Sequence, residues 1–137
     1  MTDQAERIAK LRRAYEAFSS GDFDAVAEFI HPDIEYVAPA GLSSLHGLDE
    51  FRQWMEPDAF DRQEVEPVQI EIAGNKALVR QHGRMRGAGS GIEMEVSSWA
   101  VFTVDADDRL VRFEVFPPHE EDEARRAAGL ESESASP

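Results

Sequence analysis

The sequence contains no cysteine. The chain therefore forms no disulfide, has no thiolate nucleophile and cannot build a zinc site from cysteine ligands. It has no apolar run near the roughly 20 residues that cross a bilayer. Its first residues, MTDQAERIAKLRR, lack the apolar core of a secretory signal. These absences predict a soluble protein of the cytoplasm.

Lysine is almost absent as well. Only Lys10 and Lys76 occur among 14 basic residues, which face 28 acidic residues and leave a net charge of −14. A field of this sign repels phosphate backbones and anionic lipid surfaces, so neither a nucleic acid nor a membrane is expected as a partner. The shortage of lysine fits a GC-rich genome or a salt-loving host.

The length of 137 residues suits one domain, and such a domain buries roughly 70% of its unfolded surface without disulfides. No internal repeat or linker divides the sequence. We therefore expect a single domain over residues 1–130, followed by a polar tail, 131–137, whose composition is typical of disorder.

The N-terminal half has the pattern of helices. A first helix is predicted from apolar residues at helical spacing, at Ile8, Leu11, Tyr15 and Phe18. Asp22 is placed to cap a second helix. That helix should stop at His31, because Pro32 disfavours the helical conformation of the residue before it.

The rest of the sequence has mostly the pattern of strands. A short strand over 34–38 and a helix over 48–56 precede strands at 67–73, 76–86, 91–104 and 109–116. A last helix is predicted over 119–128. Helices followed by consecutive antiparallel strands are typical of the α+β class.

The strands at 76–86 and 91–104 are expected to form a hairpin with Met85 opposite Ile92. One face of this hairpin is then almost entirely apolar, with Gln81 and Ser98 as its polar exceptions. The other face pairs residues of compatible charge or size, namely Arg84 with Glu93, His82 with Glu95 and Leu78 with Trp99.

Four segments carry a resemblance to a known family: AYEAFSSGDFDAVAEFIHPDIEYVAP (14–39), LHGLDEF (45–51), WAVFTVDADDRLVRFEVF (99–116) and EDEARRAAGL (121–130). In order and spacing they are similar to the nuclear transport factor 2-like superfamily, particularly its SnoaL-like (polyketide-cyclase-like) and ketosteroid-isomerase-like members. The resemblance implies a cone-shaped α+β barrel. In this fold, three N-terminal helices pack on a curved antiparallel sheet around an apolar cavity, with a C-terminal helix and often a homodimer through the outer sheet face.

The catalytic residues of ketosteroid isomerase are not found at the matching positions of this sequence. Ala38, before Pro39, stands where that enzyme has its general base, and Ala100 stands where it has its second acid. Its catalytic tyrosine falls nearest Ala14, and Tyr15 lies about 100° further round the helix. The isomerase mechanism is therefore not expected here.

The leading hypothesis is a pocket that binds a small apolar molecule, with neither a cofactor nor a metal ion. The candidate ligand-binding residues are Tyr15, Tyr36, Trp54, Gln81, Met94, Ser98 and Phe113. Several also have a plain packing interpretation, because aromatic and methionine side chains commonly fill cores. His31 suits the end of a helix and Asp33 suits a turn. The sequence offers no third and fourth ligand that would complete a metal site with them.

Two other functions stay open. A cyclase, isomerase or hydrolase using general acid–base chemistry would need an ionisable side chain facing the cavity. The candidates are His82, Glu95 and His46, together with Glu114 and Asp33. His82 and Glu95 would form a buried dyad if both hairpin strands were turned over. A pure dimerisation module would instead use a sheet surface around Leu78, Trp99 and Val101.

Overall fold

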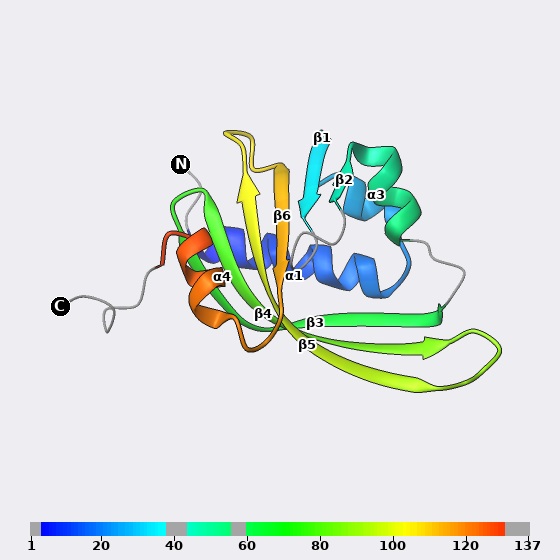
Figure 1. The fold of residues 1–137 in the computed structure, drawn as a ribbon. Helices are drawn as coiled ribbons and strands as arrows, with labels where there is room; N and C mark the ends of the chain where they lie inside the picture. Colours follow the sequence, from blue (N-terminus) through cyan, green and yellow to red (C-terminus); the bar gives the residue numbers. More distant parts are fainter. Residues whose placement is uncertain (1–3, 38–43, 56–59, 131–137) are drawn as a thin grey trace.

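The structure, a computed structural model, describes residues 4–37, 44–55 and 60–130. The helices are α1 (Gln4–Ser19), α2 (Phe23–Ala27), α3 (Leu48–Met55) and α4 (Glu121–Ala127). The strands are β1 (Ile30–Val37), β2 (Ser44–His46), β3 (Phe60–Ala73), β4 (Lys76–Gly87), β5 (Glu93–Val104) and β6 (Leu110–Phe116). Figure 1 shows the long strands β3, β4 and β5 curving beneath the helices. This arrangement confirms the predicted α+β class.

The six strands of the described residues form one sheet in the order β2-β1-β6-β5-β4-β3. Neighbouring strands run antiparallel except β1 and β6, which are parallel and place Tyr36 opposite Phe113. The parallel pair corrects the expectation of a wholly antiparallel sheet. It arises because β1 precedes the long hairpins in sequence and joins the sheet beside the last strand.

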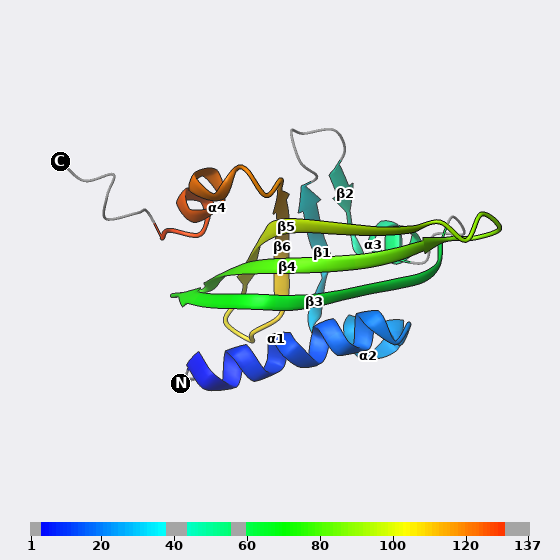
Figure 2. The same cartoon turned by 90° about the horizontal axis from the view of Figure 1, so that it is seen from below.

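Helices cover both faces of the sheet. Helix α1 lies alongside β3 with α2 behind it, and α4 lies on the opposite side (Figure 2). We call the face toward α1 the inner face and the face toward α4 the outer face. None of the helices in the described ranges is long and apolar enough to cross a membrane.

The inner face carries the larger hydrophobic cluster. Because side chains alternate along a strand, Val79 and Ala100 point inward, and each is completely buried. The other buried members are Tyr15, Val26, Ile30, Ile34, Tyr36 and Phe113. The cluster ties α1 and α2 to the sheet.

The outer face carries a second cluster under α4. Leu78, Trp99 and Val101 pack there against two almost fully buried alanines, Ala124 of α4 and Ala128 at its C-cap. The Trp99 indole Nε1–H donates to the carbonyl of Pro118 at 3.3 Å. The three sheet residues proposed as a dimerisation surface are therefore covered by the same chain.

The hairpin register is shifted by two residues from the predicted one. Met85 faces Met94 rather than Ile92, and Arg84 faces Glu95. The loop explains the shift, since Gly91 has φ +67° and donates its N–H to the Gly87 carbonyl at 3.1 Å. A residue in that left-handed conformation belongs to the turn rather than the ladder. A shift of two residues preserves the faces.

The register shift also replaces the other predicted pairs. His82 faces Ser97, Arg80 faces Trp99, and Leu78 faces Val101. The predicted pairing of Leu78 with Trp99 is therefore wrong, although both side chains lie on the outer face as expected.

Strand β3 begins at Phe60, seven residues before the predicted start at Pro67. Proline has no N–H for the ladder, which favours ending a strand there. Here β3 is the edge strand, and the register slips between Pro67 and Gln69. Val68, the residue between them, is 59% exposed. The edge position and this irregularity let the strand continue through the proline.

Helix α2 ends at Ala27, not at His31. The Leu110 N–H donates to the carbonyl of Phe29 at 2.7 Å, so the chain is already extended when it reaches Pro32. His31 thus lies in β1, where its Nδ1 accepts the N–H of Asp33 at 3.0 Å. The predicted cap is confirmed, because the Asp22 carboxylate accepts the N–H of Ala25 at 3.2 Å.

Two further differences concern β2 and α4. Strand β2 was not predicted and pairs its His46 with Glu35 of β1. Helix α4 is shorter at both ends than the predicted 119–128. Ala38, Pro39 and the tail 131–137 lie outside the described residues.

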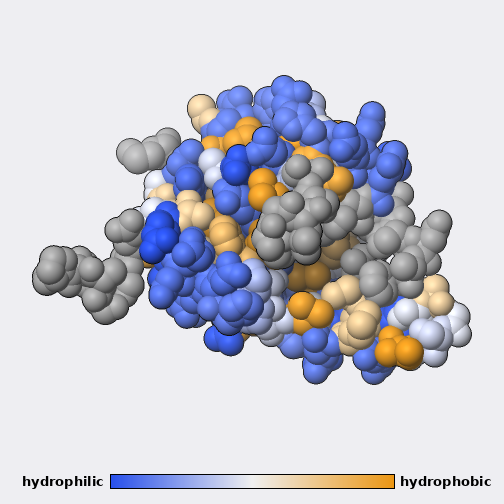
Figure 3. Space-filling model, viewed as in Figure 1, coloured by the Kyte–Doolittle hydropathy of each residue, from blue (hydrophilic) through white to orange (hydrophobic). Residues whose placement is uncertain are grey.

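The far end of the β4–β5 hairpin extends beyond the core. Ile92, Met94 and Val96 are 62%, 42% and 47% exposed there. Figure 3 shows apolar residues among hydrophilic ones at this end of the molecule, at the lower right. The two halves of the hairpin therefore have different environments.

Candidate functional site

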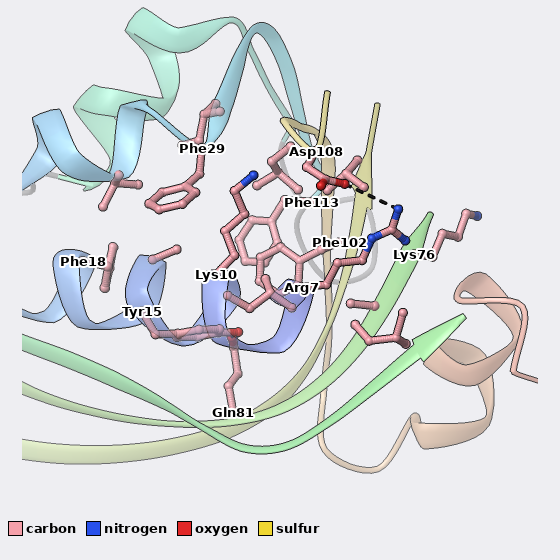
Figure 4. Close-up of a pocket in the computed structure, with 18 of the residues that line it drawn as sticks. Arg7, Lys10, Tyr15, Phe18, Phe29, Lys76, Gln81, Phe102, Asp108 and Phe113 are labelled. Atoms are coloured by element: carbon pink, nitrogen blue, oxygen red, sulfur yellow. Dashed lines mark hydrogen bonds and ion pairs between the residues drawn. The ribbon is translucent and has the colours of Figure 1, made fainter. Parts of the chain in front are cut away.

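A pocket of about 160 Å³ lies between α1 and the inner face of the sheet. Its walls include the aromatic rings of Phe18, Phe29, Phe102 and Phe113. Figure 4 shows Phe102 and Phe113 in the middle of the pocket, with Tyr15 and Gln81 at one end and charged side chains at the other. The pocket therefore has two chemically distinct ends.

Helix α1 lines the pocket with a single stripe. A helix brings residues three and four apart to the same side, and the stripe consists of Arg7, Lys10, Leu11, Ala14, Tyr15 and Phe18. The first two residues are cationic and the remaining four are apolar or aromatic. One helix face thus sets the change from a charged rim to an apolar interior.

The inner end holds a short hydrogen-bond chain. The Tyr15 hydroxyl donates to Gln81 Oε1 at 2.6 Å, and Gln81 Nε2 donates to Ser98 Oγ at 3.0 Å. Burial raises the pKa of Tyr15 well above its usual value, because the phenolate would lose its hydration. Tyr15 is therefore a neutral hydrogen-bonding group at the end of the pocket.

Stacked aromatic rings support the sheet wall. Phe102 and Phe113 stack with centroids 4.9 Å apart, and Tyr36 stacks on Phe113 at 5.2 Å. Tyr15 meets Phe102 edge to face at 5.9 Å. Such contacts fix ring orientation beyond plain burial. Phe102 and Phe113, the two rings of this stack that line the pocket, are thus held by ring contacts on both sides.

The rim is built by the start of α1 and the turn between β5 and β6. Asp105 accepts the backbone N–H groups of Asp107 and Arg109, and the bond from Arg109 is the main cause lowering its pKa. This turn leaves Asp108 at φ +61°. The Asp108 carboxylate lies 3.4 Å from the Arg7 guanidinium (Figure 4). The turn therefore links to α1 across the rim.

The predicted ligand-binding residues are divided between the pocket and other places. Tyr15, Gln81 and Phe113 line the pocket, and Ser98 lies one hydrogen bond behind Gln81. Tyr36 is buried behind Phe113 and is not among the residues that line the pocket.

Two predicted ligand-binding residues remain. Met94 lies on the exposed far end of the hairpin, outside the pocket lining. The side chain of Trp54 falls outside the described part of the structure.

The structure places the acid–base candidates away from the pocket. His82 and Glu95 lie on the outer face, with Nε2 and Oε1 3.5 Å apart, and the Glu95 side chain is 61% exposed. The buried dyad envisaged for them is therefore not formed.

The other three acid–base candidates also lie outside the pocket lining. The His46 and Asp33 side chains are 72% and 88% exposed, and Glu114 accepts from Arg112 Nε at 2.7 Å. Within the described ranges, no group of three or more His, Asp or Glu side chains is arranged to hold a metal ion.

Sequence reasoning missed the rim residues Arg7, Lys10, Lys76 and Asp108. Arg7 and Lys10 resemble the solvated side of an amphipathic helix, and Asp108 looks like an ordinary turn residue. The scarcity of lysine was a signal in the sequence, since the only two lysines both line the pocket.

Comparison with known proteins identifies the family. The family model described as a SnoaL-like domain matches residues 11–113. A curated relative, the aklanonic acid methyl ester cyclase AcmA of Streptomyces galilaeus, is 38% identical over 95 residues. The match covers 64% of this chain and 65% of the relative. The chain thus spans slightly less than two thirds of the cyclase.

Solved structures share the fold at lower identity. The epoxide hydrolase/cyclase-like enzyme SalBIII, which has a role in pyran ring formation in the polyether salinomycin, matches with a TM-score of 0.76 and 19% identity. That match covers 85% of this chain and 93% of SalBIII. An NTF2-like protein of unknown function from Burkholderia pseudomallei matches with a TM-score of 0.71 and 22% identity, covering 89% and 96% of the two chains. The chain belongs to the SnoaL-like domain family.

Proposed function

We propose that this protein binds a small, largely apolar molecule with an aromatic ring in the pocket between α1 and the inner sheet face. The pocket itself is the observation that carries the proposal. Its volume of about 160 Å³ is close to that of an apolar cavity of about 150 Å³ known to hold benzene. Phe102 and Phe113 would contact the ring.

Tyr15 would orient the ligand at the inner end. The Tyr15 hydroxyl already donates its hydrogen bond to Gln81 Oε1 at 2.6 Å. The phenol oxygen can still accept a hydrogen bond. A hydroxyl or N–H group on the ligand would supply that bond. Pockets for small molecules commonly combine apolar walls with a few such polar groups.

Titration with 2-naphthol by isothermal titration calorimetry tests the proposal. We expect saturable binding at one site in the native protein. Ala14→Leu should abolish binding because the new side chain enters the pocket, whereas Ala9→Leu, on an exposed position of the same helix, should not. Circular dichroism checks that both variants fold. No saturable binding, or equal binding by both variants, would overturn the proposal.

A cyclase is the second candidate, favoured by the 38% identity to AcmA. Ring closure at a carbon beside a carbonyl begins with removal of a proton by a base. Among the described pocket-lining residues Asp108 is the sole carboxylate, and it is paired with Arg7. Asp108 is therefore the residue in the lining that would act as the base.

Incubation with aklanonic acid methyl ester, followed by chromatography, tests this second candidate. A cyclase would form a ring-closed product, and Asp108→Asn would slow its formation. No product from the native protein would reject the cyclase and leave the binding proposal standing.

We also propose the homodimer that the family resemblance implies. Because α4 covers Leu78, Trp99 and Val101, such a dimer would use the part of the outer face around His82 and Glu95. Sedimentation should give twice the chain mass, and a monomer at micromolar concentration would contradict it. A protein whose only function is dimerisation would not bind 2-naphthol.

A further inference from the structure

We infer that the ligand of this pocket carries a carboxylate, which the ammonium group of Lys10 holds at the rim. The inference rests on the proposed function, because it concerns the ligand of the same pocket. It assigns a chemical class, an aromatic carboxylate, and a residue that selects it.

The distribution of lysine is the first observation. The sequence has two lysines, and both line this one pocket. Arg7 is a third cation there, and Asp108 is the sole acidic residue of the described lining, so the formal charge at the rim is positive. The whole chain has a charge of −14. The rim therefore has the opposite sign to the molecule as a whole.

The second observation concerns which cations are already engaged. Arg7 donates to the Gly74 carbonyl and pairs with Asp108. The Lys76 ammonium donates to the Ala127 carbonyl at 2.9 Å, at the end of α4. Lys10 has no hydrogen bond or ion pair within the described residues. It is the pocket cation whose hydrogen-bonding capacity remains available to a ligand.

The position of Lys10 suits this role. Its stem runs along the pocket and its nitrogen points toward the side where Phe29 and Asp108 lie (Figure 4). The residue is half-buried. Water competes less for a half-buried ammonium than for an exposed one, so a carboxylate bonded there gains more than it would on an open surface.

The acidic remainder of the chain does not prevent such binding. At physiological salt the screening length is about 8 Å, so charges on the distant surface contribute little at the rim. An anion that enters the pocket is affected mainly by the nearest groups. Arg7 and Lys10 are the cations among them and Asp108 is the one acidic residue of the described lining, because the Lys76 ammonium is turned toward α4.

Helix geometry separates the two polar groups of α1 that the ligand would reach, by about 140° around the helix as well as along its axis. Lys10 and Tyr15 lie five residues apart on the same stripe, which corresponds to about 7.5 Å along the helix axis. A carboxylate near Lys10 and a hydroxyl near Tyr15 therefore suit opposite ends of a flat aromatic molecule. Phe102 and Phe113 would contact the rings between these ends.

A simpler explanation of Lys10 makes a different prediction. Long cationic side chains often cover apolar surface with their stems while the ammonium stays in water. In that case Lys10 contributes only its methylene groups, and a carboxylate and its neutral amide bind equally well.

A matched pair of probes separates the two explanations. The probes are 6-hydroxy-2-naphthoic acid and 6-hydroxy-2-naphthamide, which share rings and hydroxyl and differ in charge. We expect the native protein to bind the acid about tenfold more tightly, the size of one charge-assisted hydrogen bond at its lower limit. Lys10→Met should remove this preference by weakening the binding of the acid more than that of the amide.

Arg13→Met is the control. It also removes one positive charge from α1, but at an exposed position outside the pocket lining, so it should keep the preference. Equal binding of acid and amide by the native protein would overturn the inference alone. An unchanged preference in Lys10→Met would do the same. Binding of neither probe would instead contradict the proposed function.

Discussion

The two faces of β4 and β5 differ in how completely they are filled. On the outer face, Leu78 and Val101 are 1% and 0% exposed beneath α4. On the inner face, Val79 is equally buried, yet a pocket of about 160 Å³ remains between the sheet and α1. Adjacent residues of the same strand therefore have different surroundings.

This difference separates stability from binding. The outer-face side chains beneath α4 are almost fully buried, so truncation there leaves a new cavity and lost contacts. Side chains around the pocket already adjoin free volume, so changes there should alter binding more than stability. The predictions below challenge this division, beginning with the largest effect.

Trp99→Ala should lower the free energy of unfolding by about 3–5 kcal/mol, the usual cost of truncating a buried aromatic. Leu11→Ala, at the pocket, should cost less than half as much because its side chain is only half-buried. Urea denaturation measures both values. A loss in Leu11→Ala as large as that in Trp99→Ala, despite the smaller side chain removed, would contradict the looser filling of the inner face.

Ala100→Leu should destabilise the protein by about 2 kcal/mol, because Ala100 is 0% exposed and its neighbours must move. Ala14→Leu should instead be neutral or add up to about 1 kcal/mol by filling the pocket. Thermal unfolding of the two variants compares these effects. A large loss in Ala14→Leu would mean that no usable space exists beside α1.

Tyr15→Phe should cost about 1–2 kcal/mol, because Gln81 Oε1 loses its donor at 2.6 Å. A second change, Gln81→Leu, removes the unpaired group. A double-mutant cycle in urea therefore measures the interaction between the two positions. Additive effects would indicate that the hydrogen bond contributes nothing to the inner end of the pocket.

The two tyrosines of the sequence should ionise at higher pH than free tyrosine. Burial raises the pKa of both Tyr15 and Tyr36. Their contribution to stability is therefore present below the ordinary pKa of about 10 and is lost as pH rises toward the native values. Absorbance of tyrosinate in the native protein should show little change at pH 10, and ordinary titration there would contradict the burial.

Arg84→Ala should change the free energy of unfolding by about 0.5 kcal/mol or less. Its Nε lies 3.1 Å from Glu95 Oε1, but both side chains are more than 60% exposed, and exposed ion pairs contribute little. High salt should make the effect smaller still. This value applies to the monomer: where the proposed dimer forms through this face, the loss should be larger, and a loss that does not depend on protein concentration would count against that dimer.

The face assignment was accessible from sequence because strand alternation survives a register error of two residues. Gln81 and Ser98 were predicted as polar members of an apolar face, and they hydrogen-bond to each other at 3.0 Å. The exact register was not accessible. It depends on the left-handed conformation of Gly91, which the sequence does not distinguish from a strand glycine.

The rim was missed for a different reason. Arg7 and Asp108 come together only when the β5–β6 turn folds back over the start of α1, a contact between residues far apart in sequence. Local patterns describe each residue's own element but not which turn reaches which helix. Tyr15, in contrast, was predicted because its helical stripe faces the sheet directly.

The central claim is that the inner-face pocket is a ligand site, and a crystal structure with 6-hydroxy-2-naphthoic acid tests it most directly. We expect the rings against Phe102 and Phe113, the hydroxyl at Tyr15 and the carboxylate at Lys10. Density for the ligand on the exposed hairpin end around Met94, with the pocket empty, would contradict the claim.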